Sequence, residues 1–290
     1  MSRYAAVVLV LLVLPASARP FSQFGDATSP ASSSSVAGEF VWHDLVTDDP
    51  AAARTFYGSL FGWTFEDSEG IAPGYIVIKQ DGTAIGGIIP RRRDASTPYV
   101  AQWLSYVVVP DVDDAVGIFR QRGGKVIQGP LNARKGLRVA VVEDPQGAPL
   151  GLASGAPGAA AAAPPALHNW LWMEYVARDV APALTFYEKA VGFRFEISEA
   201  REGFTYYLLQ TDRPRAGLFR SPWTRSTSAW LPYVRVADPA AMAARAAELG
   251  GTVAVTPRAE VRHASLAIIV DPAGAAVALQ KFPFDQGGAQ

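Results

Sequence analysis

The chain has 290 residues, a formal net charge of −1, no cysteine, and 49% hydrophobic against 18% charged residues. This length is sufficient for the cores of two ordinary domains. A near-neutral chain does not attract nucleic acid or acidic lipid over a distance. A chain without cysteine has no disulfide, thiolate nucleophile, zinc–thiolate site or iron–sulfur cluster.

The N-terminal segment has the features of a secretory signal. Arg3 precedes ten apolar residues, 5–14, and a pattern of small residues ends at Ala18. Ten helical residues span about 15 Å, roughly half of a bilayer core. We therefore expect a signal peptide over residues 1–18, cleaved near Ala18, with export to the periplasm or the extracellular space; an uncleaved membrane tether is the alternative. Residues 19–38, rich in Ser, Ala and Pro, are expected to form a disordered lead-in.

Residues 39–153 are predicted to form a first domain that contains the order βαβββ twice. An Asp-Pro pair at 49–50 marks the start of the first helix, and Gly62 lies just beyond its end. A second helix is predicted over 112–122. Apolar alternation predicts the strands, which are 40–47, 64–67, 75–80, 84–89, 103–109, 125–128, 137–143 and 149–152.

A second domain, 167–284, is predicted because the sequence repeats itself. The piece that begins at Trp42 returns 130 residues later at Trp172, and the Phe-Tyr pair of the first helix returns at the same spacing. Two later pieces, a Trp-Leu-x-Tyr strand and an Asp-Pro-x-Gly-Ala turn, return 127 residues later. Four blocks in one order indicate two copies of one fold. The Ala-, Gly- and Pro-rich residues 154–166 between the copies are predicted to be a linker.

This ordered set resembles the vicinal oxygen chelate superfamily, which contains glyoxalases, bleomycin-resistance proteins and extradiol dioxygenases. The resemblance covers residues 40–152 and 168–282. It implies an α+β fold of two tandem glyoxalase-like domains, each a pair of βαβββ modules that form a half-open barrel around a cavity. In metal-dependent members, a divalent ion in the cavity polarises substrate oxygens as a Lewis acid.

The ligand positions that the resemblance implies do not carry metal-binding side chains in this sequence. The first-strand position falls on Trp42 and Trp172, and the last-strand position falls on Gly151 and Ala278. Indole, glycine and alanine cannot hold a divalent metal. The middle-strand candidates are Trp103 or Leu104 and Trp230 or Leu231. We therefore expect both domains to work without a metal ion or another cofactor.

The three histidines do not change this expectation. His43 neighbours a ligand position, but side chains alternate along a strand, so it should point away from the cavity. His168 precedes the second domain's first strand, and His263 is predicted to lie in its penultimate strand. They come from different parts of the chain and do not form a ligand set within one domain.

Two carboxylates are candidates for a role in the cavities. Strand alternation places Asp44 on the face of Trp42, and Glu174 on the face of Trp172. A desolvated carboxylate beside an aromatic wall can act as a general acid or base, or can bind a polar ligand. Alternatively, it bonds backbone groups or an arginine and stabilises the strand. Arg138 and Arg262 are candidate arginine partners.

Aromatic side chains occupy matching places in both domains. They form either ordinary core or the wall of a pocket for a flat apolar ligand. The candidate ligand-binding residues are Trp42, Trp103, Tyr106, Trp170, Trp172, Trp230 and Tyr233. In addition, Phe40 and Val46 are expected on the face of Trp42, and Trp170 and Val176 on the face of Trp172.

The sequence favours an exported binding module that holds a small organic molecule, aromatic or hydrophobic, without metal. The alternative is a metal-free lyase-, isomerase- or hydroxylase-like enzyme that uses Asp44 or Glu174. A metal-dependent glyoxalase or dioxygenase is disfavoured by the ligand positions, and one domain could also be a scaffold only. We expect no nucleic-acid partner, contact with membranes only through the N-terminal segment, and a monomer whose two domains pair within the chain.

Overall fold

The computed structural model describes residues 36–68, 73–91, 100–134, 136–156, 165–223, 227–259 and 262–282. The expected signal peptide, nearly all of the lead-in and most of the linker lie outside these residues. Within them the chain forms two eight-stranded mixed sheets and four α-helices. Among the described residues, no helix has the length and apolarity needed to cross a membrane.

The first domain contains two βαβββ modules whose first strands pair with each other. The first module consists of β1 (Phe40–Thr47), α1 (Pro50–Phe61), β2 (Thr64–Asp67), β3 (Ile76–Gln80) and β4 (Thr83–Pro90). The second consists of β5 (Gln102–Val108), α2 (Val112–Gln121), β6 (Lys125–Arg134), β7 (Leu137–Glu143) and β8 (Pro149–Ser154). The sheet order is β2-β3-β4-β1-β5-β8-β7-β6, with β1 antiparallel to β5.

The second domain repeats this topology. Its first module consists of β9 (Trp170–Ala177), α3 (Val180–Ala190), β10 (Arg194–Arg201), β11 (Phe204–Gln210) and β12 (Pro214–Arg220). Its second consists of β13 (Ala229–Val236), α4 (Pro239–Glu248), β14 (Thr252–Val255), η1 (Arg262–Ala264), β15 (Leu266–Val270) and β16 (Ala276–Lys281). The order β10-β11-β12-β9-β13-β16-β15-β14 matches that of the first sheet. The predicted α+β class with two tandem domains is confirmed.

The helix boundaries follow from their capping residues. The Asp49 carboxylate accepts a hydrogen bond from the Ala52 backbone N–H at 2.9 Å, and Pro50 occupies the first turn. Gly62 ends the helix with a φ of 73°, a left-handed conformation that glycine adopts without steric cost. Asp238 caps α4 in the same way, through Ala240 and Ala241.

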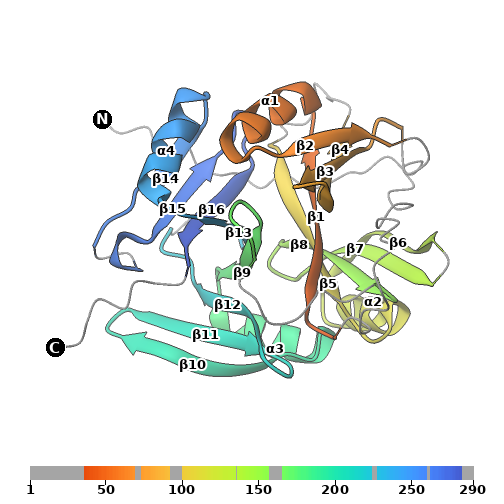
Figure 1. The fold of residues 1–290 in the computed structure, drawn as a ribbon. Coiled ribbons are helices and arrows are strands. Elements are labelled where there is room, and N and C mark those ends of the chain that lie inside the picture. The colour runs from red at the N-terminus through yellow and green to blue at the C-terminus, as the bar shows by residue number, and fades with distance from the viewer. Residues whose placement is uncertain are drawn as a thin grey trace.

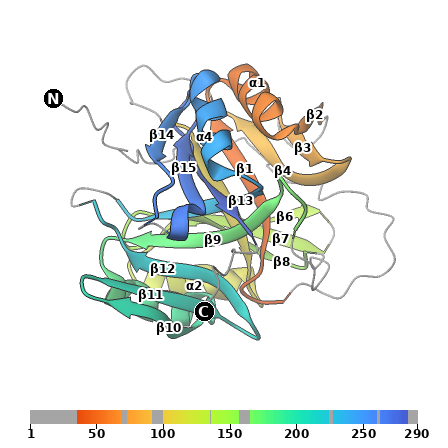
Figure 2. The same cartoon turned by 60° about the vertical axis from the view of Figure 1, so that its left-hand side comes forward.

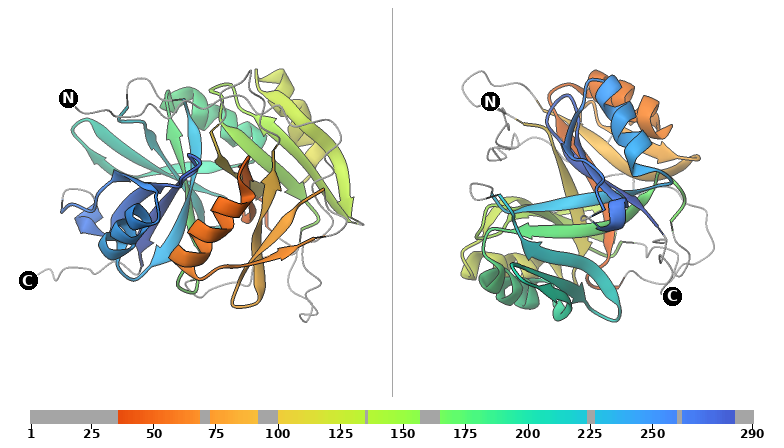
Figure 3. Two further views of the ribbon diagram at one scale, coloured as in Figure 1. Left: turned by 90° about the horizontal axis from the view of Figure 1, so that it is seen from above. Right: turned by 90° about the vertical axis from the view of Figure 1, so that its left-hand side faces the viewer.

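The two domains pack through their helices and through the helix-bearing faces of their sheets. Helix α1 lies beside α4, and α2 lies beside α3, on opposite sides of the molecule (Figures 1 and 2). The two further views show the same pairs (Figure 3). Two large apolar cores are shared between the domains: one joins α2 with α3, and the other joins α1 with α4. Each sheet therefore has one face committed to the interface between the domains.

Reciprocal hydrogen bonds connect each Asp-Pro-x-Gly turn to the Phe-Tyr pair of the other domain. The Tyr57 hydroxyl donates to Asp271 Oδ2 at 3.1 Å, and the Tyr187 hydroxyl donates to Asp144 Oδ2 at 2.8 Å. The Tyr175 hydroxyl also donates to Asp144, at 2.5 Å. Burial raises the pKa of both carboxyl groups, while these hydrogen bonds oppose the rise. Two motifs that identified the repeat thus have an interdomain role.

Candidate functional site

A large cavity lies on the free face of the second sheet, and we call it the domain 2 hollow. Its volume is about 1800 Å³, and it reaches from β9 and β11 to the segment before β15. Its aromatic lining residues are Trp172, Phe204, Tyr206, Phe219, Trp223, Tyr233 and Phe282. The free face of the duplicated fold therefore provides an aromatic-walled site in this domain.

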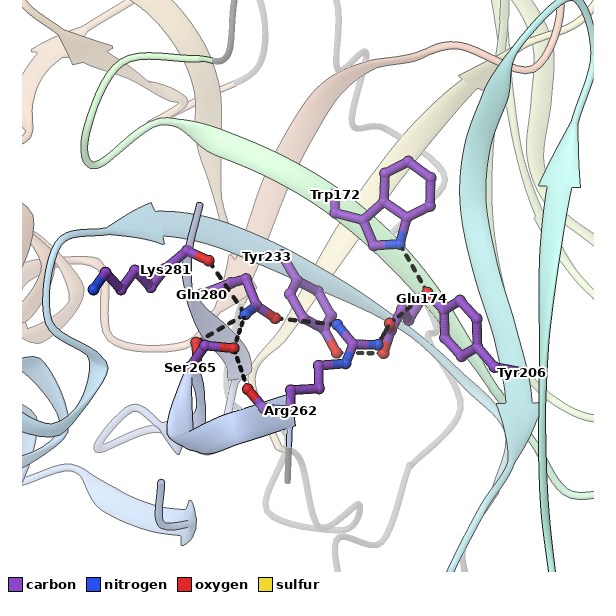
Figure 4. A network of polar contacts seen from close by, with 8 residues as sticks. All are labelled: Trp172, Glu174, Tyr206, Tyr233, Arg262, Ser265, Gln280 and Lys281. Atoms are coloured by element: carbon purple, nitrogen blue, oxygen red, sulfur yellow. Dashed lines mark hydrogen bonds and ion pairs between the residues drawn. The ribbon is translucent and has the colours of Figure 1, made fainter. Parts of the chain in front are cut away.

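The Glu174 carboxylate is the centre of a polar network in this hollow (Figure 4). Oε1 accepts hydrogen bonds from the Tyr206 hydroxyl, at 2.7 Å, and from Arg262; Oε2 accepts one from the Tyr233 hydroxyl. The Trp172 indole N–H donates to the Tyr206 oxygen at 3.1 Å. Burial raises the pKa of both tyrosines, and the adjacent Glu174 charge raises it further, so both phenols stay protonated.

Arg262 reaches Glu174 from an unusual turn. The three residues of η1 all have positive φ values: 47° at Arg262, 52° at His263 and 59° at Ala264. The guanidinium also donates to Gln280 Oε1 at 3.1 Å. Its central carbon lies 5.3 Å from the ring centre of Tyr206 and 5.6 Å from that of Tyr233, within cation–π range.

Arg262 keeps its positive charge in the hollow. Burial alone lowers the pKa of this group, but the neighbouring Glu174 carboxylate and the two tyrosines raise it by more. The turn that carries it is held in place, because the Ser265 hydroxyl donates to the Arg262 carbonyl at 2.5 Å. The Gln280 amide in turn donates to the Ser265 carbonyl at 2.8 Å. The hollow therefore contains a fixed cation paired with a fixed carboxylate.

The first domain has the same arrangement of side chains in a closed form. Asp44 Oδ1 accepts hydrogen bonds from the Tyr75 hydroxyl at 2.7 Å and from the Trp42 indole N–H at 2.9 Å. The exposure of Asp44 and Tyr106 is 0%, that of Tyr75 is 1% and that of Trp42 is 5%. Burial raises the pKa of Asp44 to about 6, although these hydrogen bonds act in the opposite direction. We call this buried cluster the domain 1 cluster.

A glycine makes room for the tyrosine hydroxyl in each domain. A β-carbon on Gly87 would overlap the Tyr75 hydroxyl and press on Asp44, and one on Gly217 would overlap the Tyr206 hydroxyl. The two glycines are 130 residues apart, like Trp42 and Trp172. A close approach of this kind is a common reason for a glycine inside a strand.

The structure divides the candidate aromatic residues between two faces. Trp42, Tyr106, Trp172 and Tyr233 belong to the carboxylate clusters. Trp103 and Trp230 lie in the shared interdomain cores, where their indole N–H groups donate to the hydroxyls of the Phe-Tyr pairs, at 3.1 Å and 2.8 Å. Since Trp103 and Tyr106 are three positions apart on one strand, strand alternation already requires opposite faces.

Two β-bulges correct the expected alternation in the first strands. The pairing register shifts between residues 40 and 42, and again between residues 170 and 172. Phe40 and Trp170 consequently face the interdomain cores rather than the free faces of the sheets. The Phe40 ring packs 5.2 Å from Trp230, and the Trp170 ring packs 4.9 Å from Trp103.

The structure tests the predictions for His43 and for the two candidate arginine partners. His43 faces the interdomain core as predicted: its Nδ1 lies 2.8 Å from Ser105 Oγ, and burial lowers its pKa to about 3, so it is neutral. The suggested pairing of Arg262 with Glu174 is confirmed. That of Arg138 with Asp44 is wrong, because Arg138 pairs with Asp113.

Two residues of the clusters, Tyr75 and Tyr206, were missed in the sequence. Their signal is weak, because they occupy a bulged hairpin and lie one residue outside the main repeat spacing. The glycine that each one requires is the better indicator. His263 is in η1 and lines the domain 2 hollow, whereas it had been predicted in a strand.

Comparison with known proteins identifies the family of the chain. Residues 39–152 match the glyoxalase/bleomycin resistance protein/dioxygenase superfamily. The mycobacterial protein CFP32 of Mycobacterium tuberculosis, whose name places it provisionally among glyoxylases, is 31% identical over 83% of this chain and 93% of its own length.

The chain belongs to the glyoxalase/bleomycin resistance/dioxygenase superfamily.

Other similar proteins have names that state different functions. The anthracycline biosynthesis protein DauV of Streptomyces sp. is 29% identical over 82% of this chain and 91% of its own. The Mn(II)-bound glyoxalase of Novosphingobium aromaticivorans superposes with a TM-score of 0.58 at 15% identity, covering 88% of this chain and 86% of that one. Homoprotocatechuate 2,3-dioxygenase of Arthrobacter globiformis gives 0.57 at 17% identity, covering 87% and 82%. At these identities the two structures show the fold alone.

The residues of this superfamily member do not fit a metal ion. Strand register aligns Trp42, Tyr106 and Gly151 across β1, β5 and β8. In the second sheet it aligns Trp172, Tyr233 and Ala278 in the same way. An indole, a phenol with a raised pKa and a small aliphatic group supply no ready ligand set. In the part of the chain that the structure describes, no three His, Cys, Asp or Glu residues gather to hold a metal.

Proposed function

We propose that this protein binds a small organic molecule with a broad aromatic or hydrophobic surface in the domain 2 hollow, without a metal ion, and one molecule per chain. The observation that carries the proposal is the contrast between an aromatic-walled cavity of about 1800 Å³ in the second domain and the fully buried cluster at the matching place in the first. Ligand sites of drug-sized molecules occupy roughly 300–1,000 Å³, so a large ligand fits.

The relatives support a ligand with fused aromatic rings. Two of them, DauV and DnrV, are named for anthracycline biosynthesis. Stacking on tryptophan, tyrosine and phenylalanine suits a flat ring system, because aromatic pairs add favourable geometry to the burial of apolar area. Residues 1–18 support an exported form of the protein, as part of the same proposal.

The polar network favours binding over base catalysis. Both oxygens of Glu174 already accept hydrogen bonds, so taking a proton from a ligand would require displacing Arg262 or a tyrosine. Asp44 has 0% exposure and no ligand reaches it without opening the first domain. The carboxylates proposed as catalytic residues therefore act here as anchors of the clusters.

Titration of the protein with the methyl ester of anthraquinone-2-carboxylic acid, followed by calorimetry, tests this proposal. We expect one site per chain. Phe219→Ala removes part of the wall and should weaken binding about tenfold, since stacking contributes roughly 1–1.5 kcal/mol beyond area burial. Phe195→Ala is the matched control, because Phe195 lies outside the hollow and is 47% exposed. Two sites per chain, or equal affinities for the two variants, would contradict the proposal.

A further inference from the structure

We infer that Arg262 is the recognition cation of the domain 2 hollow, and that the ligand class is an aromatic molecule carrying a carboxylate. This inference rests on the proposed function and specifies its ligand. Its basis is the set of hydrogen-bond donors that the Arg262 network leaves unused.

The guanidinium of Arg262 has donors to spare. An arginine offers five N–H donors in one plane. One goes from Nη2 to Glu174 and one from Nη1 to Gln280. Within the described residues the other three have no hydrogen-bond partner, while the side chain is only 29% exposed. Unused donors on a half-buried cation are suited to an anionic oxygen, because charge-assisted bonds are the stronger ones.

The position of the guanidinium is fixed before any ligand arrives. Glu174 and Gln280 hold it from two sides, and the rings of Tyr206 and Tyr233 lie within cation–π distance. A preorganised donor loses little side-chain entropy when it binds, so its hydrogen bonds contribute more to affinity.

The turn that carries Arg262 has a strained backbone. Arg262, His263 and Ala264 are three consecutive non-glycine residues with positive φ, a conformation that L side chains rarely adopt. Such strain accumulates where a side chain must be presented at a defined place. The first domain provides the contrast, since its Arg138 binds Asp113 at the surface and contributes nothing to the Asp44 cluster.

The surroundings of the hollow tolerate an anion. Its lining contains four arginine or lysine residues, against three acidic ones. The basic residues are Arg213, Arg258, Arg262 and Lys281; the acidic ones are Glu174, Glu199 and Asp238. The Glu174 charge is already compensated by Arg262 and two phenols, so it does not prevent a carboxylate from approaching the free side of the guanidinium.

The test compares two probes that differ only in charge: anthraquinone-2-carboxylate and its methyl ester. The wild-type protein should bind the acid about tenfold more tightly, as one charge-assisted hydrogen bond provides. Arg262→Gln should remove this preference, so that the ratio of the acid affinity to the ester affinity falls to about one. Glu174→Gln releases one more guanidinium donor and a competing charge, so it should widen the preference for the acid.

The outcomes separate the two proposals. Ester binding that Phe219→Ala weakens, together with an unchanged preference in Arg262→Gln, would overturn the role of Arg262 and leave the proposed function standing. Should Arg262→Gln fail to fold, an unchanged preference in Glu174→Gln would have the same consequence. If neither probe binds, both proposals fail.

Discussion

A set of four side chains, a tryptophan, a carboxylate and two tyrosines, occupies the free face of each sheet; among the described residues, the second set lines a cavity and the first is buried. In the first domain they are Trp42, Asp44, Tyr75 and Tyr106; in the second they are Trp172, Glu174, Tyr206 and Tyr233. In both domains the carboxylate accepts hydrogen bonds from two aromatic side chains of the set, although the tryptophan is one of these donors only in the first domain. The difference between the domains must therefore come from what surrounds the clusters.

The β6–β7 hairpin closes the first domain. Strand β6 has 10 residues, whereas its counterpart β14 has 4. Ile127 and Leu131 of β6 pack with Leu137 and Val139 of β7 against the domain 1 cluster. In the second domain the paired part of the hairpin ends at Val255, and the η1 turn that follows sends Arg262 into the matching space. The two copies of the fold therefore differ in how far strand pairing continues along this hairpin, and the cluster is covered where the pairing is long.

The first prediction compares how the charges of Asp44 and Glu174 affect the free energy of unfolding. The folded-state pKa of Asp44 is about 6, above its ordinary value of 3.8, so the folded protein binds the proton more tightly than the unfolded chain. Its contribution to stability is therefore full only well below pH 4 and is lost as the pH rises through 6. At 1.36 kcal/mol per pKa unit, the loss is about 3 kcal/mol.

Urea denaturation of wild type and Asp44→Asn at several values between pH 4 and pH 7 measures this effect. The free energy of unfolding of the variant, relative to that of wild type, should increase by about 2 kcal/mol over this range, because part of the full loss falls below pH 4. Glu174→Gln should instead be less stable than wild type at pH 7, because it leaves the half-buried Arg262 cation without its carboxylate. A pH-independent difference between wild type and Asp44→Asn would show that Asp44 is not a desolvated charge.

The second prediction uses the glycine behind each tyrosine. A methyl group on Gly87 would overlap the Tyr75 hydroxyl, which cannot move because the cluster is buried. Gly87→Ala should lower the free energy of unfolding by about 2–3 kcal/mol, as overpacking does. Gly217→Ala is the matched change, and there Tyr206 can swing into the hollow, so the loss should be under about 1 kcal/mol. Equal losses in thermal denaturation would mean that the second cluster is as tightly packed as the first.

The sequence predicted the repeat and the fold well and drew attention to the two carboxylates, because capping residues and strand alternation are local signals. The helix starts at Asp49 and Asp238 can be predicted from these residues alone, because each is an aspartate at the N-cap followed by proline. Alternation failed only where a bulge interrupts it, at Phe40 and Trp170, since an extra residue in one strand depends on the pairing with its neighbour.

The open or closed state of the clusters could not be predicted from the sequence. The strand predicted over 125–128 continues to Arg134, because Gly129-Pro130 sits at a bulge rather than ending the strand. That extension is what covers the first cluster. The left-handed turn at Arg262 has no local signal either, since no glycine or asparagine occupies it. Both features are determined by tertiary packing.

The last prediction concerns the tyrosine hydroxyls. Tyr75→Phe removes a buried donor to Asp44 and a partner of the Trp42 indole N–H, so it should cost about 1–2 kcal/mol of unfolding free energy. Tyr206→Phe removes the equivalent donor to Glu174, but solvent in the hollow can take its place and Arg262 still holds the carboxylate, so the cost should be below about 1 kcal/mol. Urea denaturation of both variants in the same buffer measures the two losses of unfolding free energy. A larger loss for Tyr206→Phe would mean that the second cluster excludes water as the first one does, and that its cavity opens only when a ligand enters.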